Sequence, residues 1–234
     1  MPEMGENRSY KNPEGRGFIM IELKNICKAF GNQQLYKDFS LTIETGEFVV
    51  LSGKSGCGKT TLLNIIGGLE NVDSGSVTVD GIDITGRKNK MAYFQKKAGF
   101  LFQNFALVDT KTVRENLDLI YKKSRSGISF EAALDKVGLS DKIDEKVYRL
   151  SGGAQQRAAV ARLMVKQCDI ILADEPTGSL DRENAEEIIR LLSEFCKMGR
   201  TVVMVTHDES FKNAGDRIVE LSGAVREEDG DEKA

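Results

Sequence analysis

The sequence predicts an α/β core that carries a helical insert. Short apolar runs alternate with segments of helical periodicity along most of the 234 residues, a pattern typical of strand–helix–strand units. A glycine-rich stretch, GKSGCGKT at 53–60, separates one apolar run from a helical pattern. The segment at about 104–150 has helical patterns only, so we expect it to form a smaller helical lobe.

Each expected element rests on its length and its apolar pattern. FVVL at 48–51 and IILA at 170–173 are uninterrupted apolar runs of strand length, as buried strands show. In chain order we expect strands at 19–26 and 48–51, a helix at 59–68, strands at 75–79 and 98–102, helices at 112–121, 129–137 and from 151 to about 166, a strand at 169–173, a helix at 182–196, and strands at 201–206 and 217–221.

The composition excludes several classes of function. The formal net charge is −3, so nothing points to a surface for nucleic acid. The longest apolar runs fall far short of the roughly 18 residues that a membrane helix needs, and work at a membrane would therefore require a partner protein. The four cysteines lack metal-ligand spacing, and we expect reduced thiols.

The domain boundaries are expected where the composition changes. Residues 1–19 are rich in Gly, Pro, Asn and charge and predict a disordered extension or a cloning remnant, without the apolar stretch of a signal peptide. Residues 20–225 are expected to form the folded domain. Residues 226–234 are mostly charged and predict an acidic disordered tail. The sequence shows no internal repeat, so we expect a single copy of the domain.

The stretch 53–60 matches the phosphate-binding pattern G-x-x-x-x-G-K-[ST], in the strand–helix context that the pattern requires. Its glycines let backbone N–H groups surround phosphates, and the following helix N-terminus adds roughly half a positive charge. Lys59 is expected to reach the β- and γ-phosphates, and the Thr60 hydroxyl to bind Mg²⁺. The predicted contacts to ATP come from Gly53, Lys54, Ser55, Gly56, Cys57 (through its backbone), Gly58, Lys59, Thr60 and Thr61.

Two acidic residues, Asp174 and Glu175, follow the apolar run 170–173. Successive side chains of a strand point to opposite faces, so we expect the two carboxylates to do different work. Asp174 suits contact with Mg²⁺ and its water, and Glu175 suits the base that polarises the attacking water. An acidic pair is more often a solvated strand end, but a phosphate loop in the same chain favours the catalytic interpretation.

The stretch LSGGAQQR at 150–157 opens a helix with a Ser-Gly-Gly turn. Ser151, Gly152 and Gly153 offer a hydroxyl, backbone amides and a helix N-terminus to a phosphate. The turn has no lysine of its own to complete a separate site. One loop and one turn per chain predict that two copies exchange them, so that each ATP lies between the loop of one copy and the turn of the other.

Together, the loop, the turn and the acidic pair resemble the ATP-binding cassette (ABC) family over about residues 21–221. The resemblance implies a P-loop NTPase core of the RecA-like type, with an antiparallel β subdomain and a small helical insert. It further implies that His207 and Gln103 act beside the γ-phosphate, Gln103 also at Mg²⁺, that Phe30 stacks on adenine, and that Asp181 links the two sites of a dimer. A lone histidine or phenylalanine is otherwise more often a packing residue.

The segment DEPTGSLD at 174–181 is similar to the DEPTGNLD form of the macrolide-export and lipoprotein-release (MacB/LolD) branch. This resemblance implies an ATPase subunit at the cytoplasmic face of a bacterial membrane, using ATP and Mg²⁺ and driving a separate permease for export of a peptide or other amphiphile. An importer ATPase and a soluble ATPase of the iron–sulfur assembly kind remain the alternatives. Phe105 and Leu107 are expected either at a groove for the permease or in the core.

Overall fold

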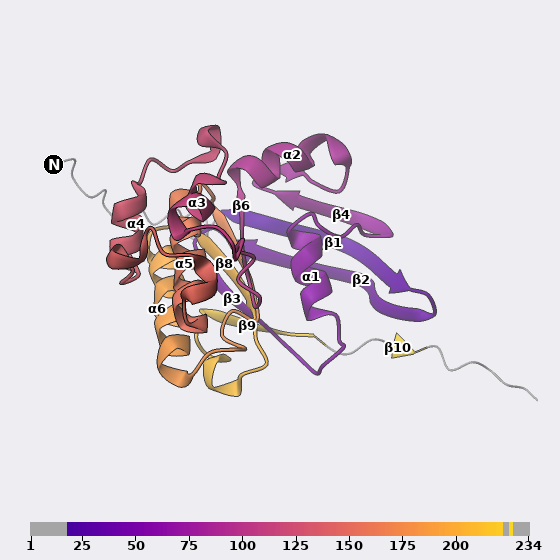
Figure 1. Cartoon of the computed structure of the whole chain (residues 1–234). Helices are drawn as coiled ribbons and strands as arrows, with labels where there is room; N and C mark the ends of the chain where they lie inside the picture. The colour runs from indigo at the N-terminus through magenta and orange to yellow at the C-terminus, as the bar shows by residue number, and fades with distance from the viewer. Residues whose placement is uncertain (1–17, 222–224, 227–234) are drawn as a thin grey trace, which may run out of the picture.

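Two β-sheets with helices packed on them make up the computed structural model, which describes residues 18–221 and 225–226 (Figure 1). The predicted extension, apart from its last two residues, lies outside the described residues, and so does the predicted tail after Arg226. In the part that is described, no helix combines the length and the apolar character needed to cross a bilayer.

One sheet is antiparallel, with the strand order β10-β2-β1-β4-β5. Its long strand β1 (Ile19–Phe30) pairs with β2 (Gln33–Glu44) on one side and β4 (Ser74–Val79) on the other. Two short strands, β5 (Ile82–Asp83) and β10 (Val225–Arg226), form the edges. β2 is an addition to the expected elements, because buried and exposed residues alternate regularly only in its second half, around Leu41 and Ile43.

The other sheet is parallel, with the strand order β6-β7-β8-β3-β9. The sheet consists of β6 (Ala98–Phe102), β7 (Ile170–Asp174), β8 (Thr201–Val205), β3 (Phe48–Ser52) and β9 (Arg217–Glu220). Because all neighbours run the same way, the carboxyl ends of these strands lie at one edge. In such sheets ligands bind beyond that edge.

The parallel sheet lies between two apolar cores. Along β3, Phe48 and Val50 belong to one cluster of buried residues, while Val49 and Leu51 belong to the other. This alternation is the two-residue period of a strand that is buried on both faces. The first core contains side chains of α5 (Gly152–Val165) and α6 (Arg182–Lys197), and the second contains those of α1 (Lys59–Ile66) and the antiparallel sheet.

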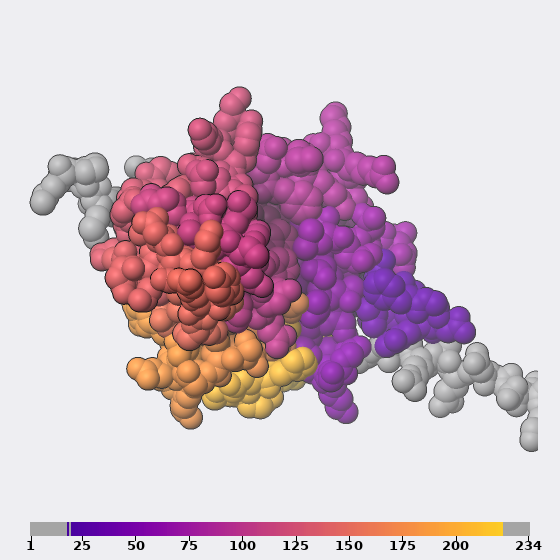
Figure 2. All heavy atoms as spheres, in the orientation of Figure 1, coloured from indigo at the N-terminus to yellow at the C-terminus, as the bar shows by residue number. Residues whose placement is uncertain are grey.

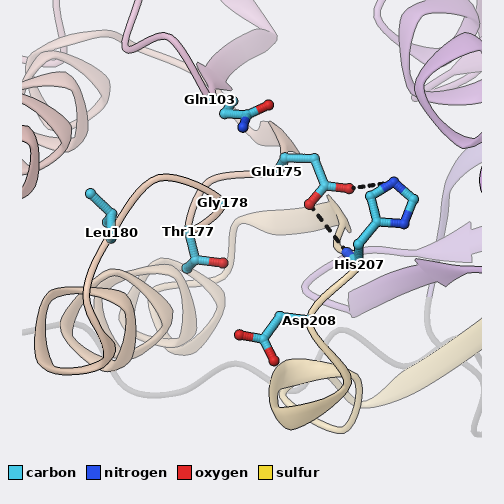
Figure 3. Close-up of a pocket in the computed structure, with 7 residues that line it drawn as sticks. All are labelled: Gln103, Glu175, Thr177, Gly178, Leu180, His207 and Asp208. Atoms are coloured by element: carbon cyan, nitrogen blue, oxygen red, sulfur yellow. Dashed lines mark hydrogen bonds and ion pairs between the residues drawn. The ribbon is translucent and has the colours of Figure 1, made fainter.

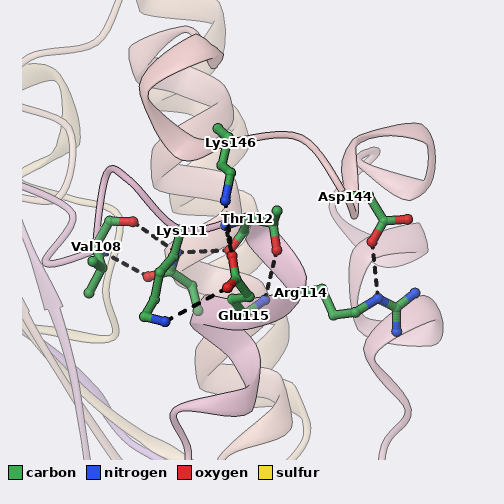
Figure 4. A network of polar contacts seen from close by, with 8 residues as sticks. Val108, Lys111, Thr112, Arg114, Glu115, Asp144 and Lys146 are labelled. Carbon is green, nitrogen blue, oxygen red and sulfur yellow. Dashed lines mark hydrogen bonds and ion pairs between the residues drawn. The ribbon is translucent and has the colours of Figure 1, made fainter.

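Polar contacts join the two ends of the helical insert (Figure 4). Its first helix, α3 (Val113–Asp118), begins with a capping box in which Thr112 and Glu115 exchange hydrogen bonds. Backbone N–H groups at the start of α3 donate to carbonyls near residue 145, which lies at the far end of the insert. The second helix is α4 (Phe130–Lys136). α3 is shorter than the expected helix at 112–121.

The helix before β6, α2 (Arg87–Lys96), is also not among the expected elements. Its sequence, RKNKMAYFQK, is mostly polar, and Tyr93 is its only buried side chain. The helix begins at Gly86 without a side-chain cap. Neither of the usual sequence signals of a helix, an apolar stripe or an N-cap residue, is therefore present.

In the space-filling view, the purple surface of the antiparallel sheet and α1 lies beside the pink and orange surface of the insert and α5 (Figure 2). The antiparallel sheet and α1, which follows the phosphate loop, thus form one side of the molecule. The insert and α5, which begins at the Ser-Gly-Gly turn, form the other side.

Candidate nucleotide site

The phosphate loop connects β3 to α1, as expected. Three of its glycines have positive φ angles: Gly53 (146°), Gly56 (77°) and Gly58 (99°). Gly58 also lies against Tyr36, whose hydroxyl oxygen would be 2.7 Å from a Cβ at this position and donates to the Gly58 carbonyl. No side chain caps the N-terminus of α1, and its first turn carries no acidic residue. The loop therefore presents backbone N–H groups and a positive helix end to an anion.

Lys59, the first residue of α1, lies inside the loop. Its ammonium donates to the carbonyls of Gly53 at 2.8 Å and of Lys54 at 3.0 Å, and the side chain is buried. Lys54 and Ser55 are exposed at the tip of the loop, and Thr61 lies in the first turn of α1. The Cys57 side chain is buried under the loop, which agrees with a contribution through its backbone alone.

Two oxygen donors suited to Mg²⁺ meet beside the loop. The Thr60 hydroxyl donates to Oδ1 of Asp174 at 3.0 Å. Burial raises the pKa of Asp174, and the hydrogen bond from Thr60 partly opposes this. In the described residues no group of three His, Cys, Asp or Glu side chains could enclose a metal. A hydroxyl and one carboxylate fit Mg²⁺, which proteins usually bind through one or two carboxylates together with substrate phosphates.

Glu175 and His207 meet just beyond the ends of β7 and β8 (Figure 3). The His207 backbone N–H donates to Oε2 of Glu175 at 3.1 Å, and its ring Nε2 lies 3.1 Å from Oε1. Burial raises the pKa of Glu175, and the hydrogen bond from His207 opposes it. Glu175 has a φ of 47°, in the left-handed region. Strained backbone of this kind is often found at functional sites.

One oxygen of Glu175 is short of hydrogen bonds. Oε1 is buried and, among the described residues, accepts no well-aligned hydrogen bond, although Nε2 of His207 is close. A buried carboxylate oxygen without a donor is costly. The Glu175 carboxylate therefore has unused capacity to accept a proton.

The carboxylate opens into a pocket of about 430 Å³ (Figure 3). Three of the predicted site residues line it: Glu175, His207 and Gln103. Gln103 follows β6 directly and reaches the pocket because Phe102 pairs with Asp174 across β6 and β7. Four further residues line the pocket: Thr177, Gly178, Leu180 and Asp208. The first three lie within the segment DEPTGSLD, which carries the family resemblance, and Asp208 follows His207 directly, but none was expected at the γ-phosphate.

Phe30 lies at the end of β1, with 49% of its surface exposed. The buried ammonium of Lys28 lies 4.6 Å from the centre of its ring. Lys28 is held in turn by Glu70, at 2.7 Å. The exposed ring is consistent with a stacking surface and not with the core phenylalanine of the alternative interpretation.

The Ser-Gly-Gly turn opens α5. Ser151 is the N-cap, and its hydroxyl accepts a hydrogen bond from the N–H of Ala154 at 3.3 Å. A Cβ at Gly153 would collide with the amide of Asn184, so glycine permits close approach of α5 and α6. Within the described residues, no hydrogen bond or ion pair joins residues 151–153 to the loop 53–60. Within one chain, Thr60 thus joins the loop to the acidic pair, and Gln103 and His207 line one pocket with Glu175, whereas the turn has no such link to the loop.

Asp181 is the N-cap of α6. Its carboxylate accepts hydrogen bonds from the backbone and side chain of Asn184, and these lower its pKa. Asn184 also accepts a hydrogen bond from Arg157 on α5. Asp181 therefore fixes the position of α6 against the turn, a role that the sequence did not indicate. Its predicted link to a second site stays a prediction.

A phosphate loop before a helix, with an acidic strand end beside it, defines a P-loop nucleoside triphosphatase. Comparisons with known proteins identify the family within this class. The family model described as ABC transporter matches residues 36–178. The lipoprotein-releasing system ATP-binding protein LolD of Porphyromonas gingivalis is 44% identical, over 87% of this chain and 96% of its own length.

One further relative and one solved structure indicate the same family. The macrolide export ATP-binding/permease protein MacB of Campylobacter jejuni (strain 81-176) is 39% identical over 92% of this chain, which spans 35% of that protein. The ATP-binding cassette MJ0796, solved as a dimer bound to ADP and Pi, has a TM-score of 0.75 at 36% identity, covering 88% of this chain and 98% of its own.

The chain belongs to the ABC transporter family. It is an ATP-binding ATPase subunit with LolD-like and MacB-like relatives, and the predicted cassette fold is confirmed.

Replacing Glu175 by Gln is expected to raise the melting temperature at pH 7. Burial makes ionisation of Glu175 less favourable in the folded chain, so its pKa lies above the ordinary 4.5. The folded state therefore binds the proton more tightly, and stability is lost as the pH rises through this titration. Gln has no charge to desolvate. At about pH 4, where a carboxyl of raised pKa is mostly protonated, the gain should shrink.

Thermal unfolding followed by circular dichroism at the two pH values measures this difference. The exposed Glu183→Gln variant serves as the control and should show no gain at either pH. An equal gain for Glu175→Gln at both pH values would contradict the burial argument.

Proposed function

We propose that two copies of this chain enclose each ATP between the phosphate loop of one and the Ser-Gly-Gly turn of the other. The observation that carries the proposal is the division of the site. No hydrogen bond or ion pair joins loop and turn within the described residues, although both have the backbone geometry that binds phosphate. The description of MJ0796 as a dimer bound to ADP and Pi supports the same arrangement.

In this arrangement the phosphate loop holds the nucleotide and Phe30 stacks on its adenine. Lys59 and the N-terminus of α1 neutralise the β- and γ-phosphates. Thr60 and Asp174, already 3.0 Å apart, would hold Mg²⁺, with Gln103 as a further oxygen donor. The metal would supply charge neutralisation at the phosphates. The turn at 151–153, from the second copy, would contact the γ-phosphate from the opposite side.

Glu175 is the proposed base. A water in the pocket passes a proton to the Glu175 carboxylate as its oxygen attacks the γ-phosphorus, while the bond to the bridging oxygen of ADP breaks. The products are ADP and phosphate. His207 holds the carboxylate through its backbone N–H, at 3.1 Å, and its exposed ring reaches toward the γ-phosphate. Such positioning and charge compensation account for most catalysis of phosphoryl transfer.

We further propose that the pair drives a separate membrane permease in the outward direction, from the cytoplasmic face of a bacterial membrane. The support is the similarity to LolD, whose name describes lipoprotein release, and to MacB, whose name describes macrolide export. The cargo would be a peptide or another amphiphile. Leu107, one of the two residues suggested for the permease groove, packs against the first core, while Phe105 is half-buried.

The first functional prediction concerns the base. Glu175→Gln should bind ATP as the wild type does, but hydrolyse it roughly 10²–10⁴-fold more slowly, the usual contribution of a general base. It should also accumulate an ATP-bound dimer, which light scattering detects. Wild-type turnover in this variant would remove Glu175 from the mechanism.

The second functional prediction concerns the shared site. A long charged side chain at the exposed Ser151 should block closure of the dimer. Ser151→Arg is therefore expected to abolish turnover and leave the nucleotide affinity of the monomer nearly unchanged. Binding of a fluorescent ATP analogue and release of phosphate measure the two quantities. If affinity falls as far as turnover, Ser151 belongs to the site of its own chain.

A further inference from the structure

The backbone just after Gln103 has an unusual conformation. Phe105 and Ala106 are consecutive non-glycine residues with positive φ angles, 62° and 48°. Side chains at Cβ disfavour this left-handed region, and two such residues in a row are rare. Something outside the loop must therefore stabilise the conformation.

The stabilising group is the guanidinium of Arg162 on α5. It donates to the carbonyl of Ala106 and, at 3.1 Å, to the carbonyl of Phe105. Both accepting carbonyls therefore belong to the residues with left-handed φ angles. A single planar side chain thus ties both peptide groups to α5, the helix that begins at the Ser-Gly-Gly turn.

Arg162 has no counter-charge at this position. In the described ranges, no carboxylate lies within ion-pair distance of it, and burial lowers the pKa of its guanidinium. A half-buried cation is costly unless it is well hydrogen-bonded. The carbonyls of Phe105 and Ala106 meet that need, so the same two hydrogen bonds offset both the strain of the loop and the burial of the cation.

Two neighbouring contacts confine the same loop. Asn116, buried in α3, accepts from the N–H of Val108 at 2.8 Å and donates back to its carbonyl at 3.1 Å. The Phe105 ring reaches the turn, where its Cζ would lie 3.8 Å from a Cβ at Gly152. The loop is thus anchored at its end by α3 and spans a face of α5 between Arg162 and the turn.

We propose that Arg162 is a positioning residue for Gln103, because it holds the loop 103–106 in its left-handed conformation against α5. This inference rests on the proposed role of Gln103 at the γ-phosphate. α5 then connects the Ser-Gly-Gly turn, which would contact the ATP bound to the second copy, with the loop 103–106, where Gln103 would contact the γ-phosphate. Arg162 is not among the residues that line the pocket, and it acts only through the loop.

Arg162→Met tests the proposal, since Met keeps an apolar stem and removes both donors. The N–H groups of Phe105 and Ala106 donate within the loop, and their hydrogen exchange reports the loop conformation. Exchange at these two amides should accelerate by about tenfold or more, as the loss of a hydrogen bond to a charged group predicts. The kcat for ATP hydrolysis should fall by a similar factor, with KM within about twofold.

A rescue distinguishes positioning from a general effect on folding. Glycine tolerates positive φ without cost, so Ala106→Gly should leave the wild type nearly unchanged and restore most of the lost kcat in Arg162→Met. Lys166→Met is the matched control. Lys166 lies at the same end of α5 and donates to the carbonyls of Phe94 and Ala98 at 2.8 and 2.7 Å, away from the loop.

The control variant should leave exchange at residues 105 and 106 unchanged. If Lys166→Met accelerates that exchange as much as Arg162→Met does, or if Ala106→Gly rescues nothing, Arg162 is only a structural part of α5. If exchange accelerates while kcat stays constant, the loop does not position Gln103. Full turnover in Gln103→Ala would instead overturn the proposed role of the glutamine, and the exchange data would still show whether Arg162 holds the loop.

Discussion

The pairing of β7 with β6 on one side and β8 on the other is the constraint on which the rest of the site depends. The parallel register places Asp174 opposite Phe102 and opposite Val205. Gln103, Glu175 and His207 lie one or two residues beyond those strand ends, so three segments far apart in the chain meet in one pocket. A shift of this register by one residue would exchange the two faces of β7 and separate the acidic pair from its partners.

The two-sided burial of the parallel sheet maintains this register. Successive residues of β3 and β7 enter different cores, so each strand is fixed by apolar packing on both faces. In β7 the polar side chain comes only at the carboxyl end, at Asp174, and Glu175 follows it. There, burial of Asp174 and Glu175 raises the pKa of both carboxyls. The same packing that stabilises the sheet therefore also sets the electrostatics of the candidate site.

Much of this arrangement could be predicted from the sequence, because short motifs with a definite backbone geometry carry it. The phosphate loop, the acidic pair and the Ser-Gly-Gly turn each combine glycines or strand ends with chemistry at fixed spacing. β2 and α2 could not be predicted in this way, since polar residues dominate α2 and the first half of β2. Their formation depends on pairing and packing with segments distant in the chain.

Residues that act through tertiary contacts could not be identified from the sequence pattern either. Arg162 lies in an ordinary helical pattern, and only the fold brings its guanidinium to Phe105 and Ala106. Asn184 gains its position between Asp181 and Arg157 in the same way. Asp181 is a helix cap in one chain, while the role that the family resemblance implies for it belongs to a pair of chains.

The dependence of ATP turnover on protein concentration tests the central claim most directly. If each active site needs the loop of one copy and the turn of another, turnover per chain should rise with concentration in dilute solution and level off once dimers form. The total rate would then increase roughly with the square of the concentration at the dilute end, as mass action requires for a dimer. Turnover per chain that stays constant down to the lowest measurable concentration would contradict the shared site, because a single chain would then suffice.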